Sequence, residues 1–257
     1  ADSSRRAYTR ALLPITASSP AEHCMDAFGV ILSGVETSAE IIITNNNIDL
    51  IEGVFTTRAG ISVSQFAPIS AVTSSTTRLM AENTVTFEDG DGIKLSYSPG
   101  FTIEKCTLTT QGIVDNSKGI HLVSSEGVTV AENILEDTGA DMATEGIRID
   151  ASRNVDVHCN TMNGFKHNLY FFLDCGCTDI MDPTTCTEII GNRLYAPGNG
   201  ENYQGLLLRN AMVSQQERTG NEWYGVTATD PANRHDATFL GDPFTAFASE
   251  FITHTTG

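Results

Sequence analysis

The chain has 257 residues, with 15 basic and 32 acidic side chains, so its formal net charge at pH 7 is −17. A surface of this charge repels nucleic acids and anionic membranes unless a local basic patch or a bridging cation intervenes. No apolar run reaches the roughly eighteen residues that a membrane-spanning helix needs, and we expect neither nucleic-acid binding nor membrane insertion.

The sequence repeats one pattern, in which Gly-apolar-x-apolar is followed by a short polar turn and then by apolar-x-apolar-x-x-Asn-x-apolar. Copies of the pattern begin at Gly29, Gly60, Gly92, Gly119, Gly146, Asn168 and Gly205. Gly92, Gly119 and Gly146 follow one another at intervals of 27 residues (119 − 92 and 146 − 119). Equal intervals of this length are typical of repeat architectures, and they predict about seven coils.

Each copy offers two or three short segments in which apolar and polar residues alternate, as in half-buried β-strands. A single short strand cannot bury enough apolar surface, so the coils are expected to stack strand upon strand at the spacing of a sheet, about 4.8 Å. The recurring Asn is expected at a tight turn, where it tolerates left-handed backbone and bonds to the Asn of the next coil. These features predict an all-β parallel solenoid.

Three strings, GIKLSYSPGFTIEKCTL, GIHLVSSEGVTVAENIL and GIRIDASRNVDVHCNTM, carry a resemblance to the right-handed parallel β-helix proteins of the pectin-lyase-like superfamily. The resemblance covers about residues 27–210 and implies a right-handed β-helix there. Such coils serve lyases, epimerases, glycosidases, tailspikes and non-catalytic surface proteins, so they identify no subfamily. We expect an N-terminal segment over residues 1–26 that can cap the solenoid. A closing segment is expected over residues 211–257, because the open end of a solenoid needs a cover.

Stacking brings side chains at the same coil position within reach of one another, which creates columns on the outside of the solenoid. The candidate catalytic residues in these columns are Lys94, His121, Arg148, Asp150 and Tyr170. Lys or Arg can neutralise a uronate carboxylate and stabilise the enolate formed on proton abstraction, while His or Tyr can act as base and acid. The cluster therefore predicts that the outer face of the middle coils recognises a polysaccharide, and it leaves open whether the protein also acts as a lyase or uronate epimerase by proton abstraction.

Neighbouring outward positions extend the predicted sugar-binding face. The candidate substrate-binding residues are Phe172, His167, Lys118 and Arg209. Two alternatives stay open: a non-catalytic sugar-binding face on which Tyr170 and Phe172 stack against the sugar, and an ordinary polar surface. The competing function is a non-catalytic structural or adhesive β-helix, such as a cell-surface, fibre or tailspike-like subunit, whose partners are other protein chains or further copies of itself.

Acidic residues gather at the turns FEDGDG and EDTGADMATEG. The candidate metal ligands are Asp89, Asp91, Asp137, Asp141 and Glu145. Hard oxygen ligands on loops suit Ca²⁺ as a cofactor, and the alternative is solvated acidic turns with no cofactor.

Three cysteines crowd into CGCTDIMDPTTC, at Cys175, Cys177 and Cys186. They predict a disulfide that closes the loop or, alternatively, a thiolate metal site. We expect a location outside the cytoplasm, either secreted, periplasmic or at the cell surface.

Overall fold

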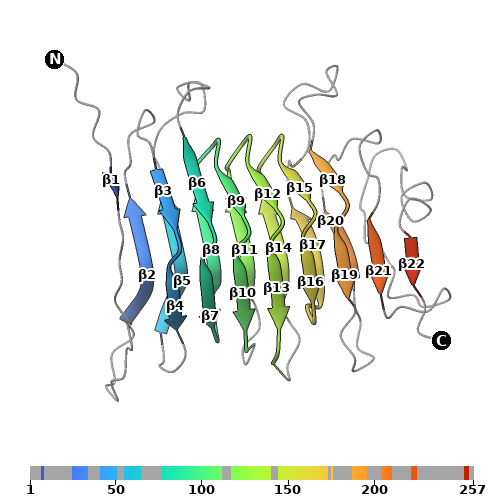
Figure 1. Cartoon of the computed structure of the whole chain (residues 1–257), viewed down its shortest axis with the longest axis horizontal. Helices are drawn as coiled ribbons and strands as arrows, with labels where there is room; N and C mark the ends of the chain where they lie inside the picture. The colour runs from blue at the N-terminus through green and yellow to red at the C-terminus, as the bar shows by residue number, and fades with distance from the viewer. Residues whose placement is uncertain are drawn as a thin grey trace.

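The computed structural model describes residues 7–8, 25–33, 41–50, 55–64, 77–111, 117–139, 144–172, 175, 187–195, 204–209, 221–224 and 252–254. These residues form β-strands and turns. The strands belong to three sheets in which each pair of neighbours is parallel. The chain visits the three sheets in a fixed cycle, and successive strands of each sheet lie side by side along the long axis of the molecule (Figure 1). The predicted all-β parallel solenoid is thus confirmed.

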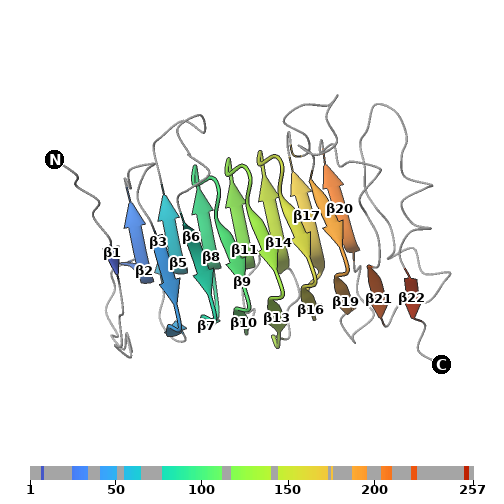
Figure 2. The ribbon, with the colours of Figure 1, turned by 45° about the horizontal axis from the view of Figure 1, so that its top comes forward.

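The first strand of each full coil lies in the sheet that we call sheet B. It contains β2 (Met25–Ser33), β5 (Phe55–Ser64), β8 (Asp91–Ser96), β11 (Lys118–Val123), β14 (Glu145–Asp150), β17 (His167–Phe172) and β20 (Gln204–Arg209). From β8 onward these strands start one residue before the repeated Gly, or before Asn168 in β17, whereas β2 and β5 start several residues earlier. They are among the longest strands of the protein (Figure 2).

The next strand of each coil lies in sheet A, which contains β1 (Ala7–Tyr8), β3 (Ile41–Thr44), β6 (Arg78–Ala81), β9 (Thr102–Glu104), β12 (Thr129–Ala131), β15 (Asp156–His158) and β18 (Glu188–Ile190). The coil closes through sheet C. That sheet contains β4 (Asn47–Leu50), β7 (Thr84–Phe87), β10 (Thr107–Thr110), β13 (Ile134–Asp137), β16 (Thr161–Asn163), β19 (Arg193–Tyr195), β21 (Glu222–Tyr224) and β22 (Ile252–His254).

The apolar positions of the repeat point inward and stack from coil to coil. In sheet B, Ile93, Ile120 and Ile147 lie in register on β8, β11 and β14, and none of them is exposed to solvent. Burial of each such side chain contributes about 1.5–3 kcal/mol to folding, so the continuous core explains why the apolar positions of the repeat vary little.

A ladder of asparagine side chains joins the turns between sheets A and C. Its members are Asn46, Asn83, Asn133, Asn160, Asn192 and Asn221, all of them buried. In each full step an Asn donates from its backbone N–H and its side-chain Nδ2 to the Oδ1 of the Asn in the next coil, as Asn133 does to Asn160 at 3.0 and 2.9 Å. The left-handed backbone lies one residue earlier than expected, for example at Glu132 with φ of 55° and at Cys159 with φ of 57°. The Asn is therefore retained for its hydrogen bonds.

A second, shorter ladder joins the turns between sheets B and A, and the sequence reasoning did not predict it. The backbone N–H of Ser98 donates to Oγ of Ser125 at 3.0 Å, and that of Ser125 donates to Oγ of Ser152 at 2.9 Å. Each hydroxyl donates in turn to a backbone carbonyl of its own coil or of the preceding coil. The small polar residue satisfies backbone groups that a buried turn would otherwise leave without partners.

Cys106 occupies the asparagine position in one coil, and its replacement by Asn is expected to stabilise the protein by about 1 kcal/mol. Its Sγ accepts only a long hydrogen bond from Nδ2 of Asn83, at 3.7 Å, whereas an amide would accept and donate at normal distances on both sides. Thermal unfolding of Cys106→Asn should therefore show a higher Tm than the wild type, while Cys106→Ala should show a lower one. An unchanged or lowered Tm for Cys106→Asn would contradict the proposed ladder role.

Candidate functional site

Sheet B carries a cluster of polar and charged side chains on the outside of its middle coils. Lys94, His121, Arg148 and Tyr170 occupy equivalent positions on β8, β11, β14 and β17, and each lies in register with the next. The same alternation that turns Ile and Leu inward turns these side chains outward. The structure thus brings the column together as a continuous set of neighbours.

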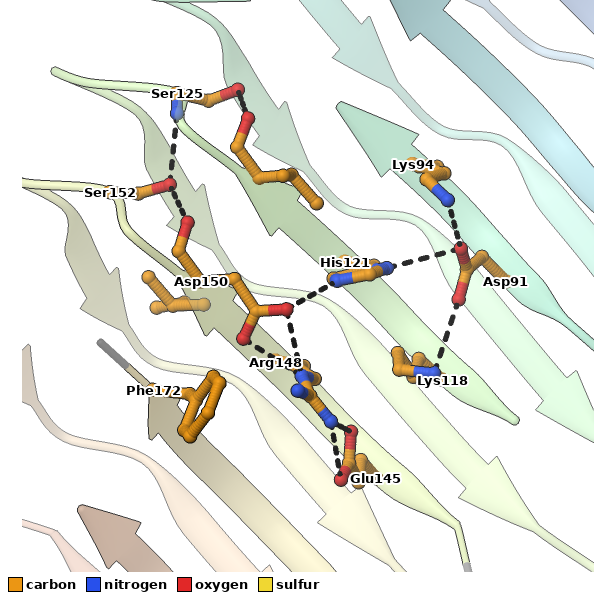
Figure 3. A network of polar contacts seen from close by, with 12 residues as sticks. Asp91, Lys94, Lys118, His121, Ser125, Glu145, Arg148, Asp150, Ser152 and Phe172 are labelled. Atoms are coloured by element: carbon orange, nitrogen blue, oxygen red, sulfur yellow. Dashed lines mark hydrogen bonds and ion pairs between the residues drawn. The ribbon is translucent and has the colours of Figure 1, made fainter. Parts of the chain in front are cut away.

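His121 is the centre of the cluster, and its side chain bridges the coils on either side (Figure 3). Its Nδ1 lies 3.1 Å from Oδ2 of Asp91 on β8, and its Nε2 lies 3.0 Å from Oδ2 of Asp150 on β14. The residue is only 8% exposed. Ionised carboxylates are acceptors only, so both contacts are hydrogen bonds at once only when the ring is a doubly protonated imidazolium.

The electrostatics favour this protonated ring. Burial by itself would lower the pKa of His121, but the hydrogen bonds to Asp150 and Asp91 outweigh burial and raise the pKa above its ordinary value. Burial would likewise raise the pKa of both carboxyl groups, but the hydrogen bond with His121 and the nearby cations hold the pKa of Asp91 and that of Asp150 below the ordinary range. The three groups therefore carry charge together.

Two lysines complete the N-terminal side of the cluster. Nζ of Lys94 lies 3.4 Å from Oδ2 of Asp91, and Nζ of Lys118 lies 3.9 Å from Oδ1 of the same carboxylate. Asp91 is thus bordered by three cationic groups from two coils, which explains how an almost completely buried carboxylate stays ionised.

Arg148 holds the C-terminal side of the cluster through two carboxylates. Its Nε donates to both oxygens of Asp150, at 2.8 and 3.0 Å, and one terminal nitrogen donates to both oxygens of Glu145, each at 3.1 Å. Burial raises the pKa of Glu145 above its ordinary value even though Arg148 and Lys118 act against the shift. The guanidinium of Arg148 therefore forms its ion pairs with two carboxylates of its own strand, β14.

Aromatic rings cover the guanidinium from the next coil. The Cζ of Arg148 lies 4.7 Å from the ring centre of Tyr170 and 5.4 Å from that of Phe172, within the range of cation–π contacts. The ring of His167 lies 5.6 Å from that of Tyr170, and its Nδ1 lies 3.9 Å from Oε1 of Glu145. Tyr170 is only 6% exposed, whereas Phe172 is partly exposed.

Most of the residues predicted for catalysis and substrate binding thus belong to one network. Lys118, His167 and Phe172 join the predicted catalytic residues, and Arg209 lies on β20 in register with Phe172, with its side chain outside the described residues. The roles of these residues in catalysis or in sugar binding stay predictions.

The predicted metal ligands that the structure describes are divided among sheet B, sheet C and a turn. Asp91 and Glu145 belong to the sheet B network, while Asp137 lies on sheet C, where it accepts hydrogen bonds from the Thr144 hydroxyl and from the backbone N–H of Gly139. Asp89 lies in the turn between β7 and β8, and Asp141 lies outside the described residues. Within the described ranges, no group of three or more His, Cys, Asp or Glu side chains is arranged to hold a metal ion.

Asp91 was predicted as a metal ligand, although the pattern of charges in the sequence could have indicated that it forms ion pairs. Asp91, Lys118 and Glu145 occupy the same position in successive coils and lie in register, so opposite charges alternate along this column. The adjacent column reads Lys94, His121 and Arg148, which places a cation beside each carboxylate. The combined pattern indicates internal neutralisation of charge.

The cysteine prediction is corrected for one residue. Cys175 is a buried thiol that is not part of a disulfide, so the predicted loop disulfide does not include it. Its Sγ takes the place of the next hydroxyl in the serine ladder and donates to the carbonyl oxygen of Ile149 at 3.1 Å. Cys177 and Cys186 lie outside the described residues.

The protonated His121 predicts a distinctive dependence of stability on pH. Since the folded pKa of His121 is raised, its contribution is full below the ordinary histidine pKa of about 6.5 and is lost as the pH rises through the folded value. The lowered pKa of Asp91 gives a contribution that is present above about pH 4 and lost as the pH falls through the folded value. The network therefore stabilises the protein most between about pH 4 and 6.5.

Urea unfolding from pH 5 to pH 9 measures this dependence. The wild type should lose about 2 kcal/mol more than His121→Gln over this range, the size of a hydrogen bond to a charged group, because the variant has no imidazolium to titrate. Taking the difference between the two proteins cancels the titration of groups that they share. Parallel pH profiles would contradict the bridging role of His121.

Comparison with known proteins supplies an independent assignment. The model of the family described as periplasmic copper-binding protein (NosD) matches residues 32–199, more than half of the chain. This is a family of right-handed parallel β-helices with the pectin-lyase-like fold, in agreement with the resemblance noted in the sequence, although the subfamily stays open. Neither the curated proteins nor the solved structures include a match to the chain.

The family match bears on two expectations. Because the family is described as copper-binding, the expectation of Ca²⁺ as the cofactor is wrong. The periplasmic location of the family agrees, in coarser form, with the predicted location outside the cytoplasm. Among the described residues there is no helix long and apolar enough to span a membrane.

The matched region runs from the end of β2 to the stretch that follows β19, so it covers most of the stacked coils and leaves out β1, β20, β21 and β22. By the extent of the match and by its fold, this chain belongs to the NosD family of periplasmic copper-binding proteins.

Proposed function

We propose that the chain is a non-catalytic periplasmic protein of copper handling, which takes up copper and offers a rigid β-helical surface to partner proteins without transforming a substrate. The family description supports the copper and the location. The observation that carries the non-catalytic part is the position of His121, whose two ring nitrogens each face a carboxylate at 3.0–3.1 Å.

Proton abstraction from a sugar needs a base with a free lone pair near the operating pH. An imidazolium held between Asp91 and Asp150 has no free lone pair, and the hydrogen bonds to both carboxylates raise its pKa and so favour the protonated ring. Tyr170, the other predicted base, is 6% exposed and packs against Arg148. These features disfavour a lyase or an epimerase at this cluster.

The cations of the cluster are also engaged. Lys94 lies beside Asp91, and Arg148 binds Asp150 and Glu145. Neutralising a uronate carboxylate would require at least one of these ion pairs to break, at the cost of leaving a partly buried carboxylate without its partner. The cluster therefore serves best as a clamp between coils that keeps the scaffold rigid.

The described residues do not fit a preformed copper site. Copper(I) prefers thiolate, thioether and imidazole ligands, and copper(II) prefers imidazole and carboxylate. His121 binds Asp91 and Asp150 through protons, and the described thiols lie on different coils, at Cys106, Cys159 and Cys175. No step of the proposed function is therefore assigned to copper bound by these side chains.

Two measurements test the proposal. Incubation with a panel of uronic acid polymers should yield no ultraviolet-absorbing unsaturated uronate, and anaerobic titration against a chromophoric copper(I) chelator should show that the whole chain takes up copper. Product formed by the wild type but not by His121→Gln would contradict the non-catalytic assignment. Failure to compete for copper would contradict the copper part.

The polysaccharide prediction can be tested with the same glycans. Retention of the wild type on an immobilised polymer, with weaker retention of Phe172→Ala, would favour a sugar-binding face, because Phe172 is the partly exposed ring beside Arg148. A protein that elutes with the void volume on every polymer would leave the scaffold role as the better account.

A further inference from the structure

We infer that the histidine and cysteine side chains of the described β-helix are structural parts of the coils, so that copper taken up by the chain is held by other donors. The inference rests on the proposed function only for the premise that the chain takes up copper. It concerns six side chains: His121, His158, His167, Cys106, Cys159 and Cys175.

Cys106 replaces an asparagine in the ladder between sheets A and C. Its Sγ lies 3.4 Å from the carbonyl oxygen of Glu104 and 3.8 Å from that of Met80, and its backbone N–H donates to Oδ1 of Asn133 at 3.0 Å. The residue is 1% exposed. Burial raises the pKa of its thiol, which disfavours the thiolate that a copper ion requires.

Cys175 plays the same role in the ladder between sheets B and A. Its Sγ lies 3.1 Å from the carbonyl oxygen of Ile149 and 3.3 Å from that of Phe172. Burial raises the pKa of this thiol to about 11, the opposite of the shift found in reactive or metal-binding cysteines. The sulfur atoms of Cys106 and Cys175 therefore substitute for the polar atoms of Asn and Ser.

The buried imidazoles are engaged as well. His121 uses both ring nitrogens in the bridge between Asp91 and Asp150, so a copper ion would have to displace a proton that two carboxylates stabilise. His167 packs against Tyr170, and its Nδ1 faces Glu145 at 3.9 Å. Both rings contribute to packing and charge balance on sheet B.

His158 and Cys159 are the most accessible donors of the six. His158 ends β15 on sheet A, and Cys159 occupies the left-handed turn that follows, where its thiol is exposed. Over the described portion of the chain, no third His, Cys, Asp or Glu completes a metal-holding group with them. Two adjacent side chains provide fewer ligands than the three or more that hold a metal ion tightly in proteins.

A pair of double variants tests the inference without disrupting the coils. The ladder variant combines Cys106→Asn with Cys175→Ser, because neighbouring coils carry Asn and Ser at these two positions. The surface variant combines His158→Asn with Cys159→Ser. His121→Gln is measured separately. Circular dichroism melting checks that each variant folds, and competition with bicinchoninate under anaerobic, reducing conditions gives the number and affinity of copper(I) ions.

The expected result is the same number of copper ions per chain in every variant, with affinities within about twofold of the wild type. Loss of one copper ion, or an affinity about tenfold weaker, in any folded variant would overturn the inference. A wild type that takes up no copper would contradict the copper role proposed above, and the thiol labelling described next would then decide whether the cysteines are structural, so the two failures are distinguishable.

Thiol labelling followed by peptide mass spectrometry provides a second readout. In the native protein iodoacetamide should modify Cys159 at the same rate with and without copper, and it should modify Cys106 and Cys175 only after unfolding. Protection of Cys159 by copper, or labelling of either buried thiol in the native state, would count against the structural assignment.

Discussion

Gly119→Ala is expected to destabilise the protein by about 3 kcal/mol, in the upper range for overpacking a core. A Cβ at this position would clash with Cδ2 of Leu135 and would lie 2.6 Å from the carbonyl oxygen of Gly146 in the next coil. The carbonyl belongs to the backbone of β14, so it can move away only if the spacing of the coils changes. Urea unfolding followed by circular dichroism measures the loss.

Gly127→Ala is the matched control for this substitution. Gly127 has a left-handed φ of +61°, but its Cβ would meet nothing closer than Nδ2 of Asn154 at 4.0 Å. The control should therefore lose only about 1–2 kcal/mol of stability, which is the cost of left-handed backbone for a residue with a Cβ. If the two variants lost equal stability, close packing between coils would not explain the repeated glycine.

Asn160→Ala is expected to cost about 4 kcal/mol, because several buried polar groups lose their partners together. Oδ1 of Asn160 accepts from the backbone N–H and Nδ2 of Asn133, and its own Nδ2 donates to the carbonyl oxygen of Val130 at 2.8 Å. Those groups lie inside the solenoid, where water cannot replace the amide. The free energy of unfolding from urea titration gives the magnitude.

Asn163→Ala serves as the companion measurement. Asn163 lies three residues further along, at the end of β16, where its side chain is exposed. Its replacement should change the free energy of unfolding by no more than about 0.5 kcal/mol. A small loss in Asn160→Ala, similar to that in Asn163→Ala, would show that the ladder contributes little.

The solenoid could be predicted from the sequence because its coils repeat at a fixed interval. The register of Lys94, His121 and Arg148 follows directly from their spacing of 27 residues, as the strand pairing shows. The asparagine ladder was also predictable, because the same residue recurs at the same coil position. The exact turn geometry was missed, because the residue with left-handed backbone varies in type from Asn45 to Glu132 and so leaves no pattern.

The two ladder cysteines were harder to recognise. Cys106 and Cys175 differ in type from the Asn and Ser that they replace. The interval of 27 residues to Asn133 places Cys106 at the ladder position, whereas Cys175 is identified by the contacts of its sulfur atom with backbone carbonyls. Residue type alone pointed Cys175 toward disulfide or metal chemistry. Burial decides between these roles, and burial depends on which coil position a residue occupies.

The chemistry of the outer cluster was the least predictable part. Lys94, His121 and Arg148 are residue types that enzymes use, and residue type alone does not reveal whether a charge is already neutralised; the alternation of charge along the columns is the sequence signal for that. Asp91 and Asp150 supply that neutralisation through contacts that depend on side-chain conformation. The family's association with copper could not be predicted from the repeat, because the repeated positions are those that pack in the core or form the turns.

Because its sheets are paired in parallel, the solenoid presents outward positions at a constant spacing. Neighbouring strands lie at a separation of about 4.8 Å that backbone hydrogen bonds set, whatever side chains the outer columns carry. Outward residues can therefore be exchanged, or a whole coil added to the stack, while the distances between the remaining outward positions stay the same. If a partner protein contacts two side chains of one column, the distance between its two contact points is a multiple of the strand separation.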